Sequence, residues 1–249
     1  MTPRLHVAAV FAPDAVLTLP PTAARHVQVL RLQPGDAITL FNGSDGADWP
    51  AEIVRIGRRD VDVRLGTAQP VDRELAFAVT IALGVPANDR MDALVEKAGE
   101  LGAAAIQPLL CERSVVRLAG ERAEARRAHW QAVAAAASEQ CGRARVARVL
   151  PLAPLASWLG SAEAASSSRR IVLSFDPAAL DLARALGAAP SAPAVAREAI
   201  VVLSGPEGGL TPAEESSAVA RGFVRVGLGP RVLRADTAPL AVLAWLGLR

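Results

Sequence analysis

The sequence predicts an α/β protein, with a small β-barrel that ends near residue 72 and a larger α/β domain with a mostly parallel sheet. Two observations lead to this prediction. Short strand-like runs separated by turn signals, such as PGD at 34–36 and NG at 42–43, fill the first 72 residues. From residue 77 onward, apolar runs alternate with helical patterns, and this alternation favours a parallel sheet. A chain of 249 residues is long enough for both parts.

The first part contains four runs that we expect to be strands, and one helical patch over residues 22–30 interrupts them. The expected strands are residues 5–11, 37–41, 51–56 and 61–65. A domain boundary near residue 73 follows from the change of pattern after Asp72.

The second part begins with an expected strand at 77–83 and a helix from about residue 90. Apolar residues from Met91 to Leu101 share one face of that helix, and Gly102 is its stop signal. We expect further strands at 104–106, 171–175 and 199–203, and a long Ala-rich helix over 121–140. The stretch 160–170, rich in Ala and Ser, is interpreted as a flexible surface loop.

The segment LSGPEGGL at 203–210 is a glycine-rich turn between an apolar strand and a marked helix start. Thr211 and Glu214 have the spacing of a capping box, and Pro212 occupies the first helical position. Glycines expose backbone N–H and C=O groups that can hold a small polar ligand. The spacing matches neither GxGxxG nor a Walker loop, so a dinucleotide or nucleoside triphosphate site is not indicated.

The segment LGPRVLRADTA at 228–238 repeats this arrangement with basic residues. It follows a strand-like run at 223–226, and Asp236 or Thr237 can cap the helix that comes next. Arg231 and Arg234 lie in the same loop, three residues apart, which favours contact with an anion or RNA over ordinary solvated charge.

Composition and sequence patterning argue against a membrane-spanning or secreted protein and leave RNA binding open. The formal net charge is only +2, yet Lys97 is the only lysine, so nearly all positive charge is arginine, which suits phosphate and stacks on bases. A GC-rich genome would explain the same bias. The sequence has no apolar run long enough for a membrane-spanning helix and no secretory signal. Cys111 and Cys141 have no metal-ligand spacing, which favours a reduced cytoplasm.

The two glycine segments, GPEGG followed by LGPRVLR, resemble those of the bacterial methyltransferases that modify N3 of a uridine in 16S ribosomal RNA. Three more segments resemble that family in the same order: RHVQVLRL at 25–32, KAGELG at 97–102 and SEQCGR at 138–143. Similar proteins usually carry Thr-Glu-Thr where this chain has Ala-Asp-Thr at 235–237, so the acid is kept but shortened. The stretch 176–198 matches no family segment that we can place.

The resemblance implies a fold, a reaction and partners. The family belongs to the SPOUT superfamily, which implies a PUA-like RNA-binding barrel over 1–72 and a SPOUT domain over 73–249 whose C-terminal segment threads a trefoil knot. It implies S-adenosylmethionine as cofactor and, as target, the N3 of uracil 1498 in 16S rRNA of the small subunit. It further implies a cytoplasmic homodimer with no metal and no membrane partner.

The resemblance also assigns residues. Arg234, Arg231, Glu207 and Asp236 are the expected catalytic residues: an arginine would stabilise the uridine anion, and an acid would accept the N3 proton or orient the group that does. For RNA contact we expect His26, Arg31 and Arg143. The expected cofactor contacts are Leu203, Gly205, Pro206, Gly208, Gly209, Leu228, Gly229, Leu233 and Thr237.

Two alternatives remain open at this stage. One is a methyltransferase that acts on another base or on a ribose 2′-hydroxyl. The other is a non-catalytic RNA-binding factor for ribosome assembly. Binding of S-adenosylmethionine and the position of the methylated nucleotide distinguish the three.

Overall fold

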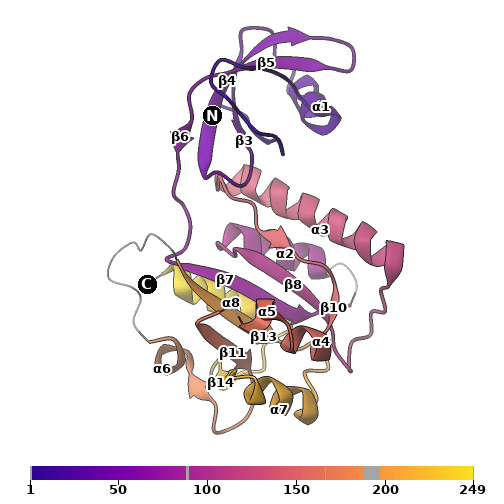
Figure 1. Cartoon of the computed structure of the whole chain (residues 1–249), viewed down its shortest axis with the longest axis vertical. Helices are drawn as coiled ribbons and strands as arrows, with labels where there is room; N and C mark the ends of the chain where they lie inside the picture. The colour runs from indigo at the N-terminus through magenta and orange to yellow at the C-terminus, as the bar shows by residue number, and fades with distance from the viewer. Residues whose placement is uncertain (1, 88–89, 166, 188–196, 249) are drawn as a thin grey trace. The chain divides into compact units, whose positions relative to one another are not determined.

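The protein is described here by a computed structural model that covers residues 2–87, 90–165, 167–187 and 197–248. The chain forms two compact units (Figure 1). The first unit contains residues 1–73 and 135–146, and the second contains residues 74–134 and 147–249. Each unit is described by itself below.

The first unit is built on a six-stranded sheet of order β1-β3-β4-β5-β2, with β6 paired to β4. All its strand pairs are antiparallel except β1 with β3. Its elements are β1 (Arg4–His6), β2 (Val16–Thr18), α1 (Pro21–Val29), β3 (Ala37–Phe41), β4 (Ala47–Ile56), β5 (Val61–Leu65) and β6 (Gln69–Pro70).

The core of the first unit follows from alternation along its strands. In β5, Val61, Val63 and Leu65 are buried, whereas Arg64 is exposed. Successive residues of a strand point to opposite faces, so one face of the sheet closes over the core. The four predicted strands are therefore present, with two corrections: the strand expected at 5–11 covers only Arg4–His6, and the strand expected at 51–56 begins at Ala47.

The second unit is a sheet of order β10-β8-β7-β13-β11-β14-β12, with β9 paired to β8, and all its pairs are parallel. This confirms the predicted parallel α/β domain. Its strands are β7 (Phe77–Gly84), β8 (Ala105–Leu110), β9 (Arg148–Val149), β10 (Ala153–Pro154), β11 (Arg169–Leu173), β12 (Leu180–Asp181), β13 (Glu198–Ser204) and β14 (Val224–Gly227).

Helices connect these parallel strands, as crossover geometry requires. They are α2 (Arg90–Glu100), α3 (Gly120–Cys141), α4 (Leu155–Leu159), α5 (Ala162–Ala165), α6 (Leu182–Leu186), α7 (Pro212–Ala220) and α8 (Thr237–Gly247). The long helix α3 belongs to the second unit as far as Ala134 and to the first unit from Ala135.

One sequence expectation about this unit is wrong. The stretch 160–170 was expected to be a flexible surface loop, but it contains α5 and the start of β11. The reason is packing: Ala164 is buried among the apolar side chains around Trp158 and Leu159. Of the unplaced stretch 176–198, residues 176–187 and 197–198 are described, and the rest lies outside the described residues.

Candidate functional site

The second unit contains a cavity of about 560 Å³ at the carboxyl ends of three neighbouring parallel strands, β13, β11 and β14. Ligands of open parallel sheets bind at this edge, where the loops leave the strands. Three segments form most of its walls: residues 204–210 at and after the end of β13, residues 226–233 and 235 at and after the end of β14, and residues 173–177 and 179 at and after the end of β11. The two glycine segments thus meet at one cavity.

The loop after β13, residues 204–210, folds tightly on itself and is named here the first glycine loop. A Cβ atom at Gly205 would lie 2.5 Å from the backbone N of Leu210 and 2.7 Å from the carbonyl C of Gly209, so only glycine fits. At the end of the loop, Thr211 and Glu214 form the predicted capping box of α7. The backbone of the loop is therefore constrained near both of its ends, at Gly205 and at Thr211.

Glu207 connects the first glycine loop to the end of β7. Its Oε1 accepts a hydrogen bond of 2.9 Å from the backbone N–H of Ala87 and lies 3.4 Å from Nη1 of Arg90. Sequence analysis assigned Glu207 to proton transfer. The structure places it on the cavity wall and also gives it a structural task, to join two segments 120 residues apart.

Arg113 is a cavity residue that sequence analysis did not single out. Its Nη1 donates to the carbonyl of Gly208 at 2.8 Å and lies 3.4 Å from that of Leu210. A Cβ atom at Gly208 would lie 3.1 Å from Cβ of Arg113, so the two residues pack closely. Nothing in the local sequence signals this role, because Arg113 follows β8, about 95 residues earlier in the chain.

The second glycine loop, residues 228–236 between β14 and α8, carries the arginines. Leu228, Gly229, Arg231 and Leu233 line the cavity, and the backbone of Gly229 has φ +86°, which favours glycine. Arg231 is exposed at this wall.

The other predicted residues of this segment, Arg234, Asp236 and Thr237, lie before or at the start of α8 and do not line the cavity. The carboxylate of Asp236 caps α8 by accepting from the N–H of Thr237 at 3.1 Å, and the carbonyl of Arg234 accepts from the same N–H at 3.0 Å. Leu203 is buried in β13, beneath the first glycine loop. The structure thus brings Arg231 and Glu207 to the cavity, whereas Arg234, Asp236, Thr237 and Leu203 lie beside it.

The third wall, residues 173–179, was missed by sequence analysis. The N–H of Ser174 donates to the carbonyl of Val226 at 2.9 Å, and the Ser174 hydroxyl donates to Glu215 at 2.9 Å. Arg225 lies 2.5 Å from the same Glu215 carboxylate and 3.5 Å from that of Asp176. The strand at 171–175 was expected, but its position between β13 and β14 depends on strand order, which local sequence patterns do not encode.

In the first unit, His26 and Arg31 are exposed on α1 and directly after it, as RNA contact requires. The side-chain Nε2 of Gln28, in the same helix, donates to the carbonyl O of Gly57 in the β4–β5 turn at 3.3 Å. This turn also carries the exposed Arg58 and Arg59. Arg143 differs, because only 2% of its surface is exposed, which does not fit direct contact with RNA.

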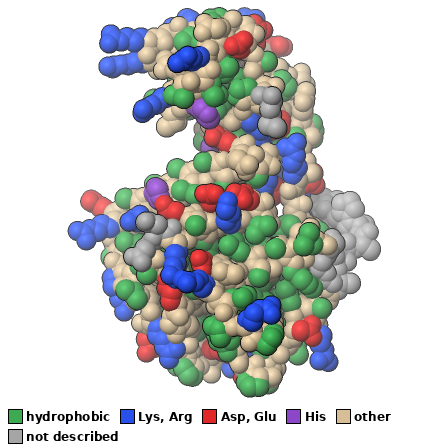
Figure 2. Space-filling view, turned by 180° about the vertical axis from the view of Figure 1, so that it is seen from behind, with side chains coloured by type: hydrophobic (Ala, Val, Ile, Leu, Met, Phe, Trp, Pro, Cys, Tyr) green, Lys and Arg blue, Asp and Glu red, His purple; other side chains and the backbone are tan. Residues whose placement is uncertain are grey.

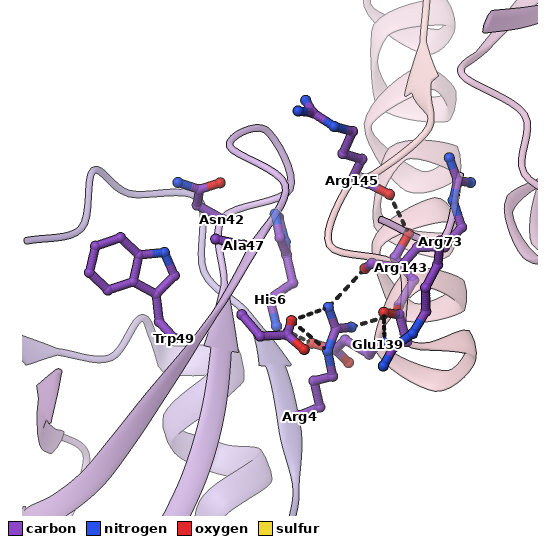
Figure 3. Close-up of polar contacts among 12 residues, drawn as sticks. Arg4, His6, Asn42, Ala47, Trp49, Arg73, Glu139, Arg143 and Arg145 are labelled. Atoms are coloured by element: carbon purple, nitrogen blue, oxygen red, sulfur yellow. Dashed lines mark hydrogen bonds and ion pairs between the residues drawn. The ribbon is translucent and has the colours of Figure 1, made fainter. Parts of the chain in front are cut away.

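Arg143 belongs to a polar cluster between β1 and the end of α3 (Figure 3). The guanidinium of Arg4 donates to the carbonyls of Ser138 at 2.8 Å and Arg143 at 2.9 Å, and it pairs with Asp48 at 2.7 Å. A cation at the carboxyl end of a helix stabilises the exposed carbonyls there. Burial lowers the pKa of the nearby His6, which favours its neutral form.

Charge is distributed without one dominant sign. On the face shown in Figure 2, basic and acidic side chains are interspersed with apolar ones over the second unit. Among the residues that the structure describes, no group of three or more His, Cys, Asp and Glu is arranged to hold a metal ion. A search of the same residues finds no helix with the length and apolarity to span a membrane.

The part of the chain that forms this parallel sheet and its cavity matches a family of RNA-modifying enzymes. The family described as the RNA methyltransferase domain matches residues 73–247, and the RNA methyltransferase PUA domain matches residues 19–66. The chain is 34% identical to the ribosomal RNA small subunit methyltransferase E of a Synechocystis strain, over 98% of this chain and 77% of that protein.

Two solved structures are also similar. The crystal structure of a ribosomal RNA small subunit methyltransferase E from Neisseria gonorrhoeae, bound to S-adenosyl methionine, has 34% identity and a TM-score of 0.86, and covers 99% of this chain and 97% of that one. A putative methyltransferase from Legionella pneumophila, in complex with the same cofactor, has 30% identity and a TM-score of 0.88, with coverage of 100% and 98%. The chain therefore belongs to the ribosomal RNA small subunit methyltransferase E family.

Proposed function

We propose that this protein transfers a methyl group from S-adenosylmethionine to N3 of one uridine in 16S rRNA of the small ribosomal subunit. The observation that carries the proposal is the cavity between the two glycine loops, in a chain whose relatives are named as small-subunit rRNA methyltransferases. Two similar structures were solved with that cofactor bound.

The cavity fits such a cofactor. Its volume of about 560 Å³ lies within the range of small-molecule sites. Its walls combine exposed backbone at Gly208 and Gly229 with the aliphatic side chains of Leu228 and Leu233. Backbone groups can bind the polar ends of the cofactor, while the leucines contact its apolar surface.

The chemistry assigns tasks to the residues of this chain. Bound S-adenosylmethionine supplies an electrophilic methyl group. N3 of uridine is a poor nucleophile until it loses its proton, and the resulting charge spreads onto the neighbouring carbonyl oxygens. We assign the stabilisation of that charge to Arg231, because Arg113, the other arginine on the wall, already donates to the loop carbonyls. Glu207 is the predicted acid that lines the cavity.

The first unit, which contains the proposed barrel over 1–72, would bind the RNA through α1 and the β4–β5 turn. His26, Arg31, Arg58 and Arg59 are exposed there, and arginines in contact with phosphates bind less tightly as salt rises. The double substitution Arg58→Ala and Arg59→Ala should therefore weaken RNA binding and reduce the dependence of that binding on salt. We further propose that the protein forms a homodimer and that its C-terminal segment threads a trefoil knot.

The test uses small subunits from a bacterial strain that lacks the corresponding gene. Purified protein and S-adenosylmethionine labelled in the methyl group are added, and the modified nucleotide is located by mass spectrometry of RNA fragments. We expect one methyl group, on N3 of a uridine in 16S rRNA. Lys97→Gln, a surface change outside the cavity lining, serves as a control with unchanged rate.

Other outcomes would replace the proposal. A methyl group on a ribose 2′-hydroxyl or on another base would keep the enzyme and change its target. Cofactor binding without transfer to any RNA would indicate a non-catalytic binding factor. Absence of cofactor binding by the folded protein would remove the two glycine loops from the site.

A further inference from the structure

Phe175 is the only exposed side chain among the Phe and Trp residues, all of which the structure describes. The sequence has five Phe and four Trp. Seven of these nine are buried and Trp245 is half-buried, whereas Phe175 is 74% exposed. A solvent-exposed Phe gives up the burial that normally makes this residue stabilising. Single exposed apolar side chains are common on protein surfaces, so the role of Phe175 is inferred from its place in the cavity wall.

Phe175 also lines the cavity, in the wall after β11. Because most of its side chain is in solvent, a ligand that approaches the cavity can reach it. A second ligand that enters the cavity beside a bound cofactor could therefore contact this ring. Its apolar ring provides a flat surface in the same cavity that Arg231 lines.

The backbone on both sides of Phe175 is held in place. The N–H of Ser174 donates to Val226 and the N–H of Asp176 donates to the Ser174 hydroxyl at 3.0 Å. The N–H groups of Ala178 and Ala179 both donate to Asp176, at 2.9 Å each. A side chain between such anchored neighbours is positioned before its ligand arrives, and this lowers the entropic cost of binding.

We propose that Phe175 is the stacking surface for the RNA base that enters the cavity to be methylated. A base cannot present its reacting edge to a cavity while it is stacked within the RNA, so it must be unstacked or turned out. Bases in that state are held by stacking on aromatic side chains. This inference rests on the proposed function and assigns Phe175 to substrate positioning, with no part in proton transfer.

The test compares Phe175→Ala, Phe175→Leu and Phe175→Trp in the full-length protein. Two quantities are measured for each: the Kd for S-adenosylmethionine by calorimetry, and the KM and kcat for methylation of small subunits. We expect Phe175→Ala to raise the KM for RNA about tenfold or more, from the loss of base–aromatic stacking. Phe175→Leu should resemble Ala, because it restores apolar bulk without a π face, and Phe175→Trp should resemble the wild type.

Val115→Ala is the matched control, because Val115 is an equally exposed apolar residue, at 76%, that does not line the cavity. Its KM should be unchanged. A weaker cofactor Kd with unchanged KM for RNA would overturn the inference and assign Phe175 to the adenine of the cofactor. Wild-type kinetics for Phe175→Ala would also overturn it. If the wild-type protein methylates no small-subunit RNA, the proposed function fails instead, and the two failures are distinguishable.

Discussion

The two glycine loops line one cavity but are supported in different ways. The first glycine loop is held from outside by Arg113 and by the N–H of Ala87, which donates to Glu207, and it ends in a capping box. The second glycine loop ends in a single cap by Asp236 and has its arginines exposed. The first loop is therefore suited to hold the cofactor in a fixed position. The second loop is suited to present positive charge to the substrate. This division of tasks predicts that equivalent mutations in the two loops will have different effects.

Gly205→Ala should give the largest effect. The new Cβ would lie within 2.9 Å of three backbone atoms, so the first glycine loop must refold, and side-chain rearrangement cannot relieve the clash. We expect no detectable cofactor binding by calorimetry, with the circular dichroism spectrum unchanged. Gly208→Ala is the milder control, since its Cβ would meet only the side chain of Arg113, at 3.1 Å. Normal cofactor affinity in Gly205→Ala would show that this loop is not a fixed cradle.

The arginines of the second loop should give the next largest effect. Because Arg231 lines the cavity and Arg234 does not, Arg231→Ala should lower kcat about 100-fold, as expected for removal of one group that stabilises developing charge. Arg234→Ala should change kcat much less. Steady-state kinetics at saturating RNA measures both. A larger loss for Arg234→Ala would instead assign the stabilisation of the developing charge to Arg234.

Gly229→Ala should have a moderate effect. No atom lies within 4 Å of the added Cβ, so there is no clash, but the φ of +86° strains any other residue. That strain costs about 1–2 kcal/mol, equivalent to a loss of roughly 5- to 30-fold in cofactor affinity if the loop shifts to relieve it. Calorimetry of Gly229→Ala beside Gly205→Ala checks the ranking. An effect equal to that of Gly205→Ala would mean that the two loops are equally constrained.

Labelling of Cys111 gives a further test of the first glycine loop, with a smaller expected effect. Burial, and then the nearby charge of Glu214, raise the pKa of its thiol to about 12. Since the thiolate is the reactive form, iodoacetamide should leave Cys111 unlabelled in the native protein at pH 8. The thiol packs near Pro206 of the loop, around the position of Gly84. Gly205→Ala should therefore make Cys111 reactive, as mass spectrometry would show, and fast labelling of the wild type would contradict this packing.

The sequence predicted the local parts of this site well. Both glycine loops, the capping box at Thr211 and Glu214 and the cap at Asp236 were read from residues close together in the chain, and the structure confirms the caps. Each depends on backbone hydrogen bonds within a few residues, which local patterns encode.

The parts that sequence analysis missed depend on long-range placement. Arg113 and Ala87 contact the first glycine loop from about 95 and 120 residues away. The wall that carries Phe175 joins the cavity because β11 lies between β13 and β14. The buried Arg143 illustrates the same limit, because its exposure depends on the fold around it.

The pairing of β13 has a consequence for hydrogen exchange. All seven residues of β13 pair with β7, four of them also pair with β11, and the run Ile200–Ser204 is buried. β14, by contrast, pairs with β11 over three residues and with β12 over two. Amide protons of β13 should therefore exchange only when the whole sheet opens, while those of β14 exchange through smaller openings. A ligand that binds both glycine loops would link the two strands, so its clearest protection signal should come from β14, on the less stable side of the cavity.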